Sequence, residues 1–182
     1  MDKTFDPRHL DIKAFAQAGA ELHGETPLTD CPRLLQEQFA APADTGKVRW
    51  QIQGRMVPVT GGTPQVSLSL QAEVDLAMQC QRCLTPVVAQ VLAENAFIFV
   101  ADEATAEALD EDSETDVLVI SRDFDVLSLV EDELILALPL VPRHDVCPED
   151  LPQEAVDEAF EVAAADRPHP FAALAALKKK AD

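Results

Sequence analysis

Residues 65–78 read Gln-Val-Ser-Leu-Ser-Leu-Gln-Ala-Glu-Val-Asp-Leu-Ala-Met, and the predicted fold is built around this stretch. Apolar and polar side chains alternate over its whole length, which is the pattern of a β-strand with one buried face. Comparable runs lie on either side of it, over residues 48–56 and 87–100, with short turns between them. Because consecutive strands joined by short turns pair antiparallel, the three runs predict an antiparallel meander.

Segments of helical periodicity flank these strands. Residues 7–20 and 32–39 precede the meander, and residues 126–138 follow it, with Asp125 expected to cap the last helix. Residues 116–121 predict a short strand that rejoins the sheet. The sequence therefore predicts an α+β fold, chiefly an antiparallel β-meander or barrel-like sheet with flanking helices and an acidic C-terminal region.

The helix expected over residues 126–138 has one apolar face. Its members recur at spacings of three and four residues and are Leu127, Val130, Leu134 and Leu138. This arrangement leaves the acidic run 131–133 on the expected solvent side of the helix.

The chain of 182 residues is long enough for one domain with an attached tail. We expect a single α+β domain over residues 1–148, followed by an acidic linker and a C-terminal helix over residues 149–182. Within the domain, residues 101–115 carry one large apolar side chain and several like charges in a row. Such a segment cannot bury much surface, so it predicts a mobile acidic loop.

The net charge of −19 is concentrated in one part of the chain. Residues 101–166 hold 21 of the 33 acidic side chains and two basic ones, while the rest of the chain is balanced. Proteins bind a phosphate backbone through clustered lysine and arginine, and this sequence has no concentrated basic segment of that kind. The charge therefore predicts a basic partner, although acidic stretches can also serve solubility alone.

Two pairs of soft metal ligands are separated by about 60 residues. Cys80 and Cys83 form a C-x-x-C pair between two predicted strands, at the expected tip of a hairpin, and His144 and Cys147 form an H-x-x-C pair. Structural zinc is held tetrahedrally by cysteine and histidine in such closely spaced pairs, so these four residues predict a zinc site. Two alternatives stay open: a reduced thiol pair beside a histidine bonded to the backbone, and a thiol-redox pair formed by Cys80 and Cys83.

Several motifs follow one another in a characteristic order. They are Cys80-Gln-Arg-Cys83, then Glu-Asp-Glu-Leu-Ile-Leu-Ala-Leu-Pro-Leu-Val-Pro-Arg-His over residues 131–144, then Cys147, and Pro-Phe-Ala-Ala-Leu-Ala-Ala-Leu-Lys over residues 170–178. In this order the chain resembles the YceD family, the large ribosomal RNA subunit accumulation proteins. The resemblance implies a role in the synthesis, processing or stability of 23S ribosomal RNA, hence in ribosome biogenesis, without a known catalytic activity. Some branches of the family have more cysteines after the proline-rich run, where this chain has Cys147.

The sequence favours a non-catalytic, cytoplasmic protein. It contains no Ser-His-Asp order, no glycine-rich phosphate loop and no H-E-x-x-H motif, and it has neither a secretory signal nor a run of apolar residues that could span a membrane. We expect a binding module for a basic ribosomal or rRNA-processing protein, with any contact to rRNA being indirect. One alternative is direct rRNA binding, through Arg49, Arg55, Arg82 and the lysines at 178–180. Another is a zinc-binding or thiol-redox protein that acts through Cys80 and Cys83.

Overall fold

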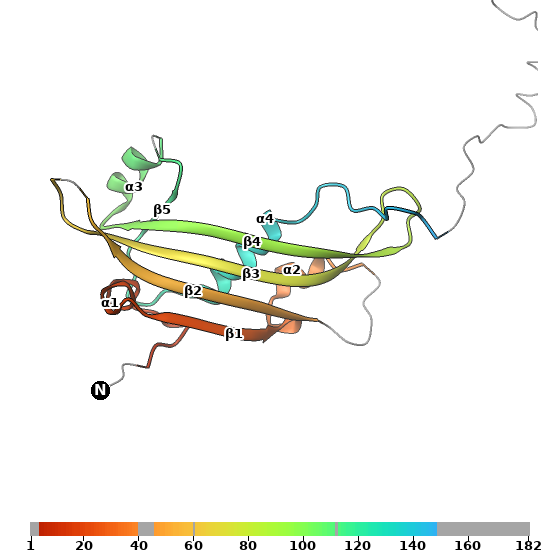
Figure 1. The fold of residues 1–182 in the computed structure, drawn as a ribbon, viewed down its shortest axis with the longest axis horizontal. Coiled ribbons are helices and arrows are strands. Elements are labelled where there is room, and N and C mark those ends of the chain that lie inside the picture. The colour runs from red at the N-terminus through yellow and green to blue at the C-terminus, as the bar shows by residue number, and fades with distance from the viewer. Residues whose placement is uncertain (1–3, 40–45, 60, 112, 149–182) are drawn as a thin grey trace, which may run out of the picture. The chain divides into compact units, whose positions relative to one another are not determined.

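The computed structural model describes residues 4–39, 46–59, 61–111 and 113–148 (Figure 1). The chain divides into two compact units, Met1–Val146 and Cys147–Asp182, and every described helix and strand belongs to the first unit. The acidic linker and the C-terminal helix predicted over residues 149–182 lie outside the described residues. No helix in the described ranges combines the length and the apolar character that crossing a membrane requires.

A five-stranded sheet forms the centre of the first unit, with the strands side by side in sequence order (Figure 1). The strands are β1 (Glu21–Pro27), β2 (Lys47–Val57), β3 (Gln65–Gln79), β4 (Pro86–Val100) and β5 (Asp116–Val119). Strands β1 to β4 pair antiparallel, which confirms the alternating pattern's prediction for β2, β3 and β4. The β3–β4 ladder runs without a register shift from Val66 opposite Phe99 to Gln79 opposite Pro86, so it extends as far as the C-x-x-C turn.

The predicted short strand over residues 116–121 does rejoin the sheet, as β5, and it runs parallel to β4. A parallel neighbour requires a connection that carries the chain back along the sheet, and a helix lies in that connection. The sheet is open: within the described ranges, β1 and β5 do not pair with each other, so closure into a barrel is not confirmed.

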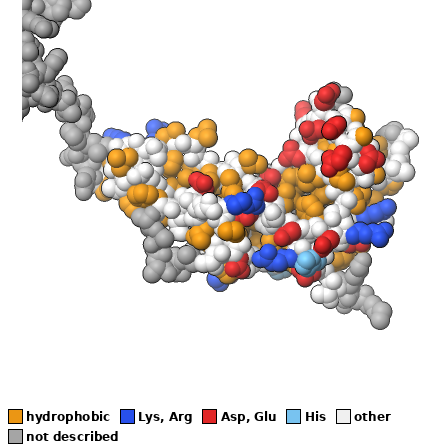
Figure 2. All heavy atoms as spheres, turned by 180° about the vertical axis from the view of Figure 1, so that it is seen from behind, with side chains coloured by type: hydrophobic (Ala, Val, Ile, Leu, Met, Phe, Trp, Pro, Cys, Tyr) orange, Lys and Arg blue, Asp and Glu red, His pale blue; other side chains and the backbone are white. Residues whose placement is uncertain are grey.

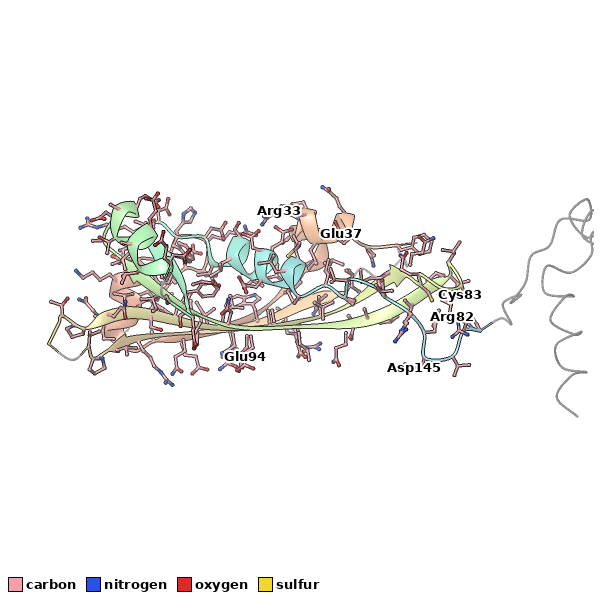
Figure 3. The ribbon with its side chains drawn as sticks, turned by 90° about the horizontal axis from the view of Figure 1, so that it is seen from above. Arg33, Glu37, Arg82, Cys83, Glu94 and Asp145 are labelled. Carbon is pink, nitrogen blue, oxygen red and sulfur yellow. The ribbon has the colours of Figure 1, made fainter. Side chains whose placement is uncertain are left out.

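Helices cover one face of the sheet. They are α1 (Ile12–Ala18), α2 (Pro32–Gln36) with the short 3-10 turn η1 (Leu28–Asp30) before it, and α4 (Val126–Leu136). Figure 3 shows α2 and α4 on one side of the sheet and Glu94 on the other. Alternate strand positions therefore face these helices and form the core, which includes Val48, Ile52, Leu68, Leu70, Leu76 and Phe97.

Helix α1 lies directly on β2 at Gly54. A Cβ atom at this position would lie 2.5 Å from the ring of Phe15 and 3.0 Å from the backbone of Ala16. The close approach therefore requires glycine. Gly19, with φ 57°, ends α1, because the left-handed conformation at a helix C-terminus favours glycine.

The prediction of a mobile acidic loop over residues 101–115 is wrong, because helix α3 (Glu103–Asp110) lies within it. Asp102 caps this helix by accepting a hydrogen bond from the backbone N–H of Thr105 at 2.8 Å. Alanine and glutamate have high helix propensity, and the acidic Asp102 and Glu103 lie at the positive end of the helix dipole. Local propensity and the cap therefore outweigh the repulsion between like charges.

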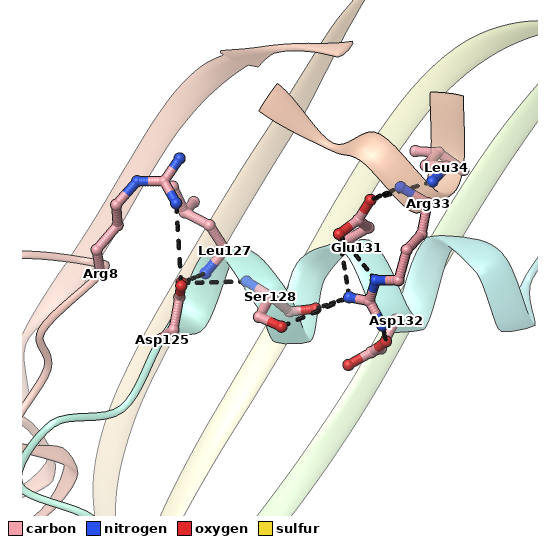
Figure 4. A network of polar contacts seen from close by, with 8 residues as sticks. All are labelled: Arg8, Arg33, Leu34, Asp125, Leu127, Ser128, Glu131 and Asp132. Carbon is pink, nitrogen blue, oxygen red and sulfur yellow. Dashed lines mark hydrogen bonds and ion pairs between the residues drawn. The ribbon is translucent and has the colours of Figure 1, made fainter. Parts of the chain in front are cut away.

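The prediction that residues 131–133 face solvent is wrong for Glu131, which is only 6% exposed. Its carboxylate accepts hydrogen bonds from the backbone N–H groups of Arg33 at 2.7 Å and Leu34 at 3.0 Å, at the beginning of α2 (Figure 4). The guanidinium of Arg33 donates two further bonds to the same carboxylate and also pairs with Asp132. Glu131 therefore joins α4 to α2 by satisfying N–H groups that a helix N-terminus leaves without partners.

Candidate metal centre

The turn between β3 and β4 brings Cys80 and Cys83 to one side of the hairpin tip. The backbone N–H of Cys80 donates to the carbonyl of Thr85 at 2.9 Å, and the N–H of Leu84 donates to the carbonyl of Cys80 at 2.8 Å. Leu84 has φ 62°, in the left-handed region. These bonds close a tight turn around the C-x-x-C segment.

Leu84 is the one described non-glycine residue with positive φ, and its side chain is 62% exposed. A left-handed conformation costs an L-residue about 1–2 kcal/mol, whereas glycine adopts it freely but loses more entropy on folding. We expect Leu84→Gly to raise the free energy of unfolding by about 0.5–1 kcal/mol, measured by urea denaturation. Leu84→Ala is the matched control, since it removes the same exposed side chain but keeps the strain. Equal stabilities for the two variants would contradict the prediction.

The segment that follows α4 folds back onto this turn. The backbone N–H of Gln81 donates to the carbonyl of Pro142 at 2.8 Å. Two residues later, the ring of His144 lies with Nε2 3.1 Å from the carbonyl oxygen of Pro86 and Nδ1 3.4 Å from Sγ of Cys83. A carbonyl can only accept, so Nε2 must carry a proton, which leaves Nδ1 as the nitrogen that faces the sulfur. Zinc-bound histidines show this arrangement, in which the second ring N–H donates to a carbonyl.

The structure brings all four predicted ligands together. Cys147 follows three residues after His144, and the ligand atoms of Cys80, Cys83, His144 and Cys147 all lie within 4.8 Å of one another. A tetrahedral zinc ion with bonds of about 2.0–2.3 Å needs its ligand atoms about 3.3–3.8 Å apart. Small side-chain movements would therefore fit this donor set of three sulfurs and one nitrogen to zinc.

The surroundings of Cys80 favour its thiolate. Burial acts to raise the pKa of this thiol, but hydrogen bonds to the sulfur outweigh burial and lower the pKa to about 5. The backbone donors are the N–H groups of Cys83, His144 and Arg82. Hydrogen bonds to the sulfurs of Cys80 and Cys83 in turn raise the pKa of His144. A thiolate is the form of cysteine that binds metal, so the turn holds Cys80 in the form that a metal ligand requires.

Cys31 provides a contrast within the same chain. It is also buried, 3% exposed, and lies before α2, outside the group of four ligands. Burial, with the charges of Glu131 and Asp30 adding to it, raises the pKa of this thiol to about 11. Burial and neighbouring negative charges therefore favour the neutral thiol at Cys31, whereas N–H donors at the hairpin turn favour the thiolate of Cys80.

A second feature of interest is the acidic surface of α3. Glu103, Glu107, Asp110 and Glu111 are exposed there, and acidic side chains gather over this part of the molecule in Figure 2. The basic residues considered for RNA binding are differently placed: Arg49 pairs with Glu73 at 2.6 Å, and Arg55 donates to Gln53. The charge of Arg49 is thus partly neutralised by Glu73, whereas Arg55 keeps its charge beside a neutral amide.

The positioning groups of the metal centre are not visible in the sequence. The carbonyls of Pro86 and Pro142 and the turn at Leu84 place the ligands, yet every residue has a carbonyl and leucine rarely adopts positive φ. Spacing identifies the cysteine and histidine side chains. It carries no signal for the backbone groups that orient them.

Comparison with known proteins supplies a further observation. The family model described as "Large ribosomal RNA subunit accumulation protein YceD" matches residues 68–178, which begin in β3 and include the C-x-x-C turn and α4. A Haemophilus influenzae protein with that same description is 38% identical over 112 residues, 60% of this chain. The chain spans 64% of the length of that relative. No solved structure matches the chain.

Proposed function

The chain belongs to the YceD family, and we propose on that premise that it supports the accumulation of large-subunit ribosomal RNA during ribosome biogenesis. The match over residues 68–178 is the observation that carries this proposal, because it includes the C-x-x-C turn and the run 131–144. The family description names an accumulation role and no reaction. We therefore assign the chain a binding role and no catalytic one.

The donor set of the metal centre supports a non-catalytic role. Catalytic zinc sites keep one coordination position open for water or substrate, whereas four protein ligands close the tetrahedron. Cys80, Cys83, His144 and Cys147 supply four ligands, so the zinc that we propose here would tie the end of the β3–β4 hairpin to the segment after α4. A thiol-redox role has less support, because Cys80 is 0% exposed and an attacking thiolate must be accessible.

The partner that the charge distribution favours is a basic protein. Helix α3 presents several exposed carboxylates, and a surface of one sign attracts the opposite sign over a distance of about 8 Å at physiological salt. A basic ribosomal or rRNA-processing protein fits this surface, and contact with rRNA would then be indirect. Direct rRNA binding is the second candidate, carried by Arg82, whose side chain is exposed at the hairpin tip.

The test is the ratio of large-subunit to small-subunit rRNA in cells whose own copy of the gene is replaced. We expect deletion of the gene to lower this ratio and the wild-type chain to restore it. The double variant Glu107→Gln and Glu111→Gln should restore it less well, because it removes two exposed charges from one face of α3. These changes lie near the C-terminus of the helix, where acidic residues oppose the dipole, so a loss cannot come from a weaker helix.

The matched control is the double variant Glu37→Gln and Asp75→Asn, which removes two exposed charges elsewhere on the chain. We expect it to behave as the wild type does. A ratio that is unchanged on deletion of the gene would refute the proposed function, and equal effects of the two double variants would refute the role of the acidic surface.

A further inference from the structure

Among the residues that the structure describes, backbone groups along about half of the outer edge of β4 have no backbone partner. In a strand, the N–H and C=O groups of every second residue point to the same side. The carbonyl of Val100 accepts a bond from Ile120 N–H at 2.8 Å on the side away from β3, and the N–H of Ala96 bonds the side chain of Asn95. By this alternation, the residues whose backbone groups point away from β3 are Val88, Gln90, Leu92 and Glu94.

Other elements occupy both ends of this edge and leave its middle open. Strand β5 pairs with Phe97–Val100, and the ring of His144 contacts the carbonyl of Pro86. Within the described part of the chain, no strand or backbone hydrogen bond covers the outer side of residues 88–94. At about 3.3 Å per residue this gap is about 20 Å long, enough for a strand of about six or seven residues.

The side chains of the gap do not protect it. Natural sheets block their free edges with lysine, proline or a bulge, because an open edge pairs with other chains. Residues 88–94 contain no lysine and no proline, and the β3–β4 register shows no bulge. Val88 is 70% exposed and Leu92 is 61% exposed, and both lie on the face of the sheet that the helices do not cover. An added strand would cover part of both side chains.

Carboxylates gather at one end of the gap. Asn95 Nδ2 donates to Asp116 at 2.7 Å and to Glu133 at 3.1 Å, and neither carboxylate has an ion-pair partner among the described residues. Burial raises the pKa of Glu133, the Asn95 bond opposes that shift, and the charge of Asp116 adds to it. A hollow of about 450 Å³ beside this group is lined in part by Glu94 and Glu114. A cationic side chain would relieve the repulsion here.

We propose that the β4 edge between Val88 and Glu94 binds an extended, basic peptide segment by strand addition. Backbone hydrogen bonds would supply affinity, and the carboxylates at the Glu94 end would select lysine or arginine. This inference deepens the proposed function and depends on it for the nature of the partner, since it locates a surface for the basic protein. A second copy of this chain is a poorer occupant, because two chains of net charge −19 repel each other.

The test uses the full chain and a fluorescent nine-residue peptide of alternating valine and lysine, with binding measured by anisotropy. Two further peptides of the same sequence are N-methylated at every second residue, one at the odd positions and one at the even positions. Each keeps its charge but loses the N–H donors along one of its two edges. We expect at least one of the two methylated peptides to bind more than about tenfold more weakly. We also expect a valine–glutamate peptide not to bind. Equal affinity for all three lysine peptides would show attraction by charge alone and would overturn the proposal.

Leu92→Pro tests the protein side of the same bonds. Proline removes an N–H that points away from β3, so the β3–β4 ladder stays intact, as for proline in edge strands generally. We expect this variant to bind the lysine peptide at least about tenfold more weakly. Leu92→Thr, the matched control, keeps the N–H and should stay within about threefold of the wild type. The same loss in both variants would overturn the proposal.

Other possible occupants of the β4 edge would be recognised by different measurements. Slow amide exchange at Val88, Gln90, Leu92 and Glu94 in the free chain would mean that the chain covers its own edge. A dimer in sedimentation that Leu92→Pro dissociates would identify a second copy as the occupant. Either result would overturn the proposal, whereas exchange that slows only when the lysine peptide is added supports it. If no peptide binds while the wild-type chain restores the rRNA ratio, the strand addition fails and the proposed function stands.

Discussion

Protein produced with ample zinc is expected to hold one zinc ion per chain, and Cys80→Ser is expected to lose it. Cys80 is the thiolate that N–H donors stabilise, and serine offers a weaker, neutral ligand in its place. Structural zinc sites bind with about 10–16 kcal/mol in isolated peptides, so the loss of one of four ligands should weaken binding by at least about 100-fold. Elemental analysis gives the stoichiometry, and competition with a chromogenic chelator gives the affinity.

The chain carries its own control for this experiment. Cys31→Ala removes a buried thiol that lies outside the ligand group, so this variant should retain one zinc ion. Wild-type protein without zinc under these conditions would refute the metal centre and leave Cys80 and Cys83 as structural thiols. Zinc bound by Cys80→Ser with the wild-type affinity would show that the ion binds elsewhere.

Glu131→Ala is expected to lower the free energy of unfolding by about 3 kcal/mol, the largest effect that we expect from a change away from the metal centre. The change removes the acceptor for two backbone N–H groups, and it leaves that of Leu34, which is buried, and that of Arg33, which is partly buried, without this partner (Figure 4). The guanidinium of Arg33 is half exposed and keeps Asp132, so its charge is not stranded and adds little to the cost. Urea denaturation measures the difference.

The neighbouring residue separates this mechanism from a general loss of charge. Asp132 pairs with the same guanidinium but is 47% exposed, and exposed ion pairs contribute about 0–1 kcal/mol. Asp132→Ala should therefore cost less than about 1 kcal/mol, and Glu131→Gln should recover part of the loss because the amide keeps one acceptor oxygen. If Glu131→Ala and Asp132→Ala were equally destabilising, the capping role of Glu131 would be wrong.

The difference between α3 and Glu131 shows two kinds of prediction error. The helix over Glu103–Asp110 has local signals, namely alanine, glutamate and a capping aspartate, and these outweigh the run of like charges that predicts a loop. The burial of Glu131 has no local signal, because the N–H groups that it caps lie 97 and 98 residues away in the sequence. The helical repeat alone predicts that an acidic residue of α4 faces solvent. Only the distant N–H groups explain why Glu131 is buried.

The four candidate metal ligands are an intermediate case, because the sequence predicts part of their arrangement. Pair spacing is enough to identify Cys80, Cys83, His144 and Cys147 as candidate ligands, since each pair must reach one ion. The approach of the two pairs depends on the chain returning to the hairpin after α4, which the bond from Gln81 to Pro142 shows. That bond is between backbone groups, so the side-chain sequence carries no trace of it.

Side-chain pattern along the chain is sufficient to specify β2, β3 and β4, their antiparallel order, the cap of α4 at Asp125 and the choice of the thiol and imidazole groups as candidate ligands. These features depend on periodicity, short turns and residue chemistry, all of which act between residues close in the chain. Long-range packing accounts for the parallel placement of β5, the burial of Glu131 and the open edge of β4 between Val88 and Glu94. Each of these depends on which distant segment occupies a neighbouring position, and local side-chain patterns do not encode that choice.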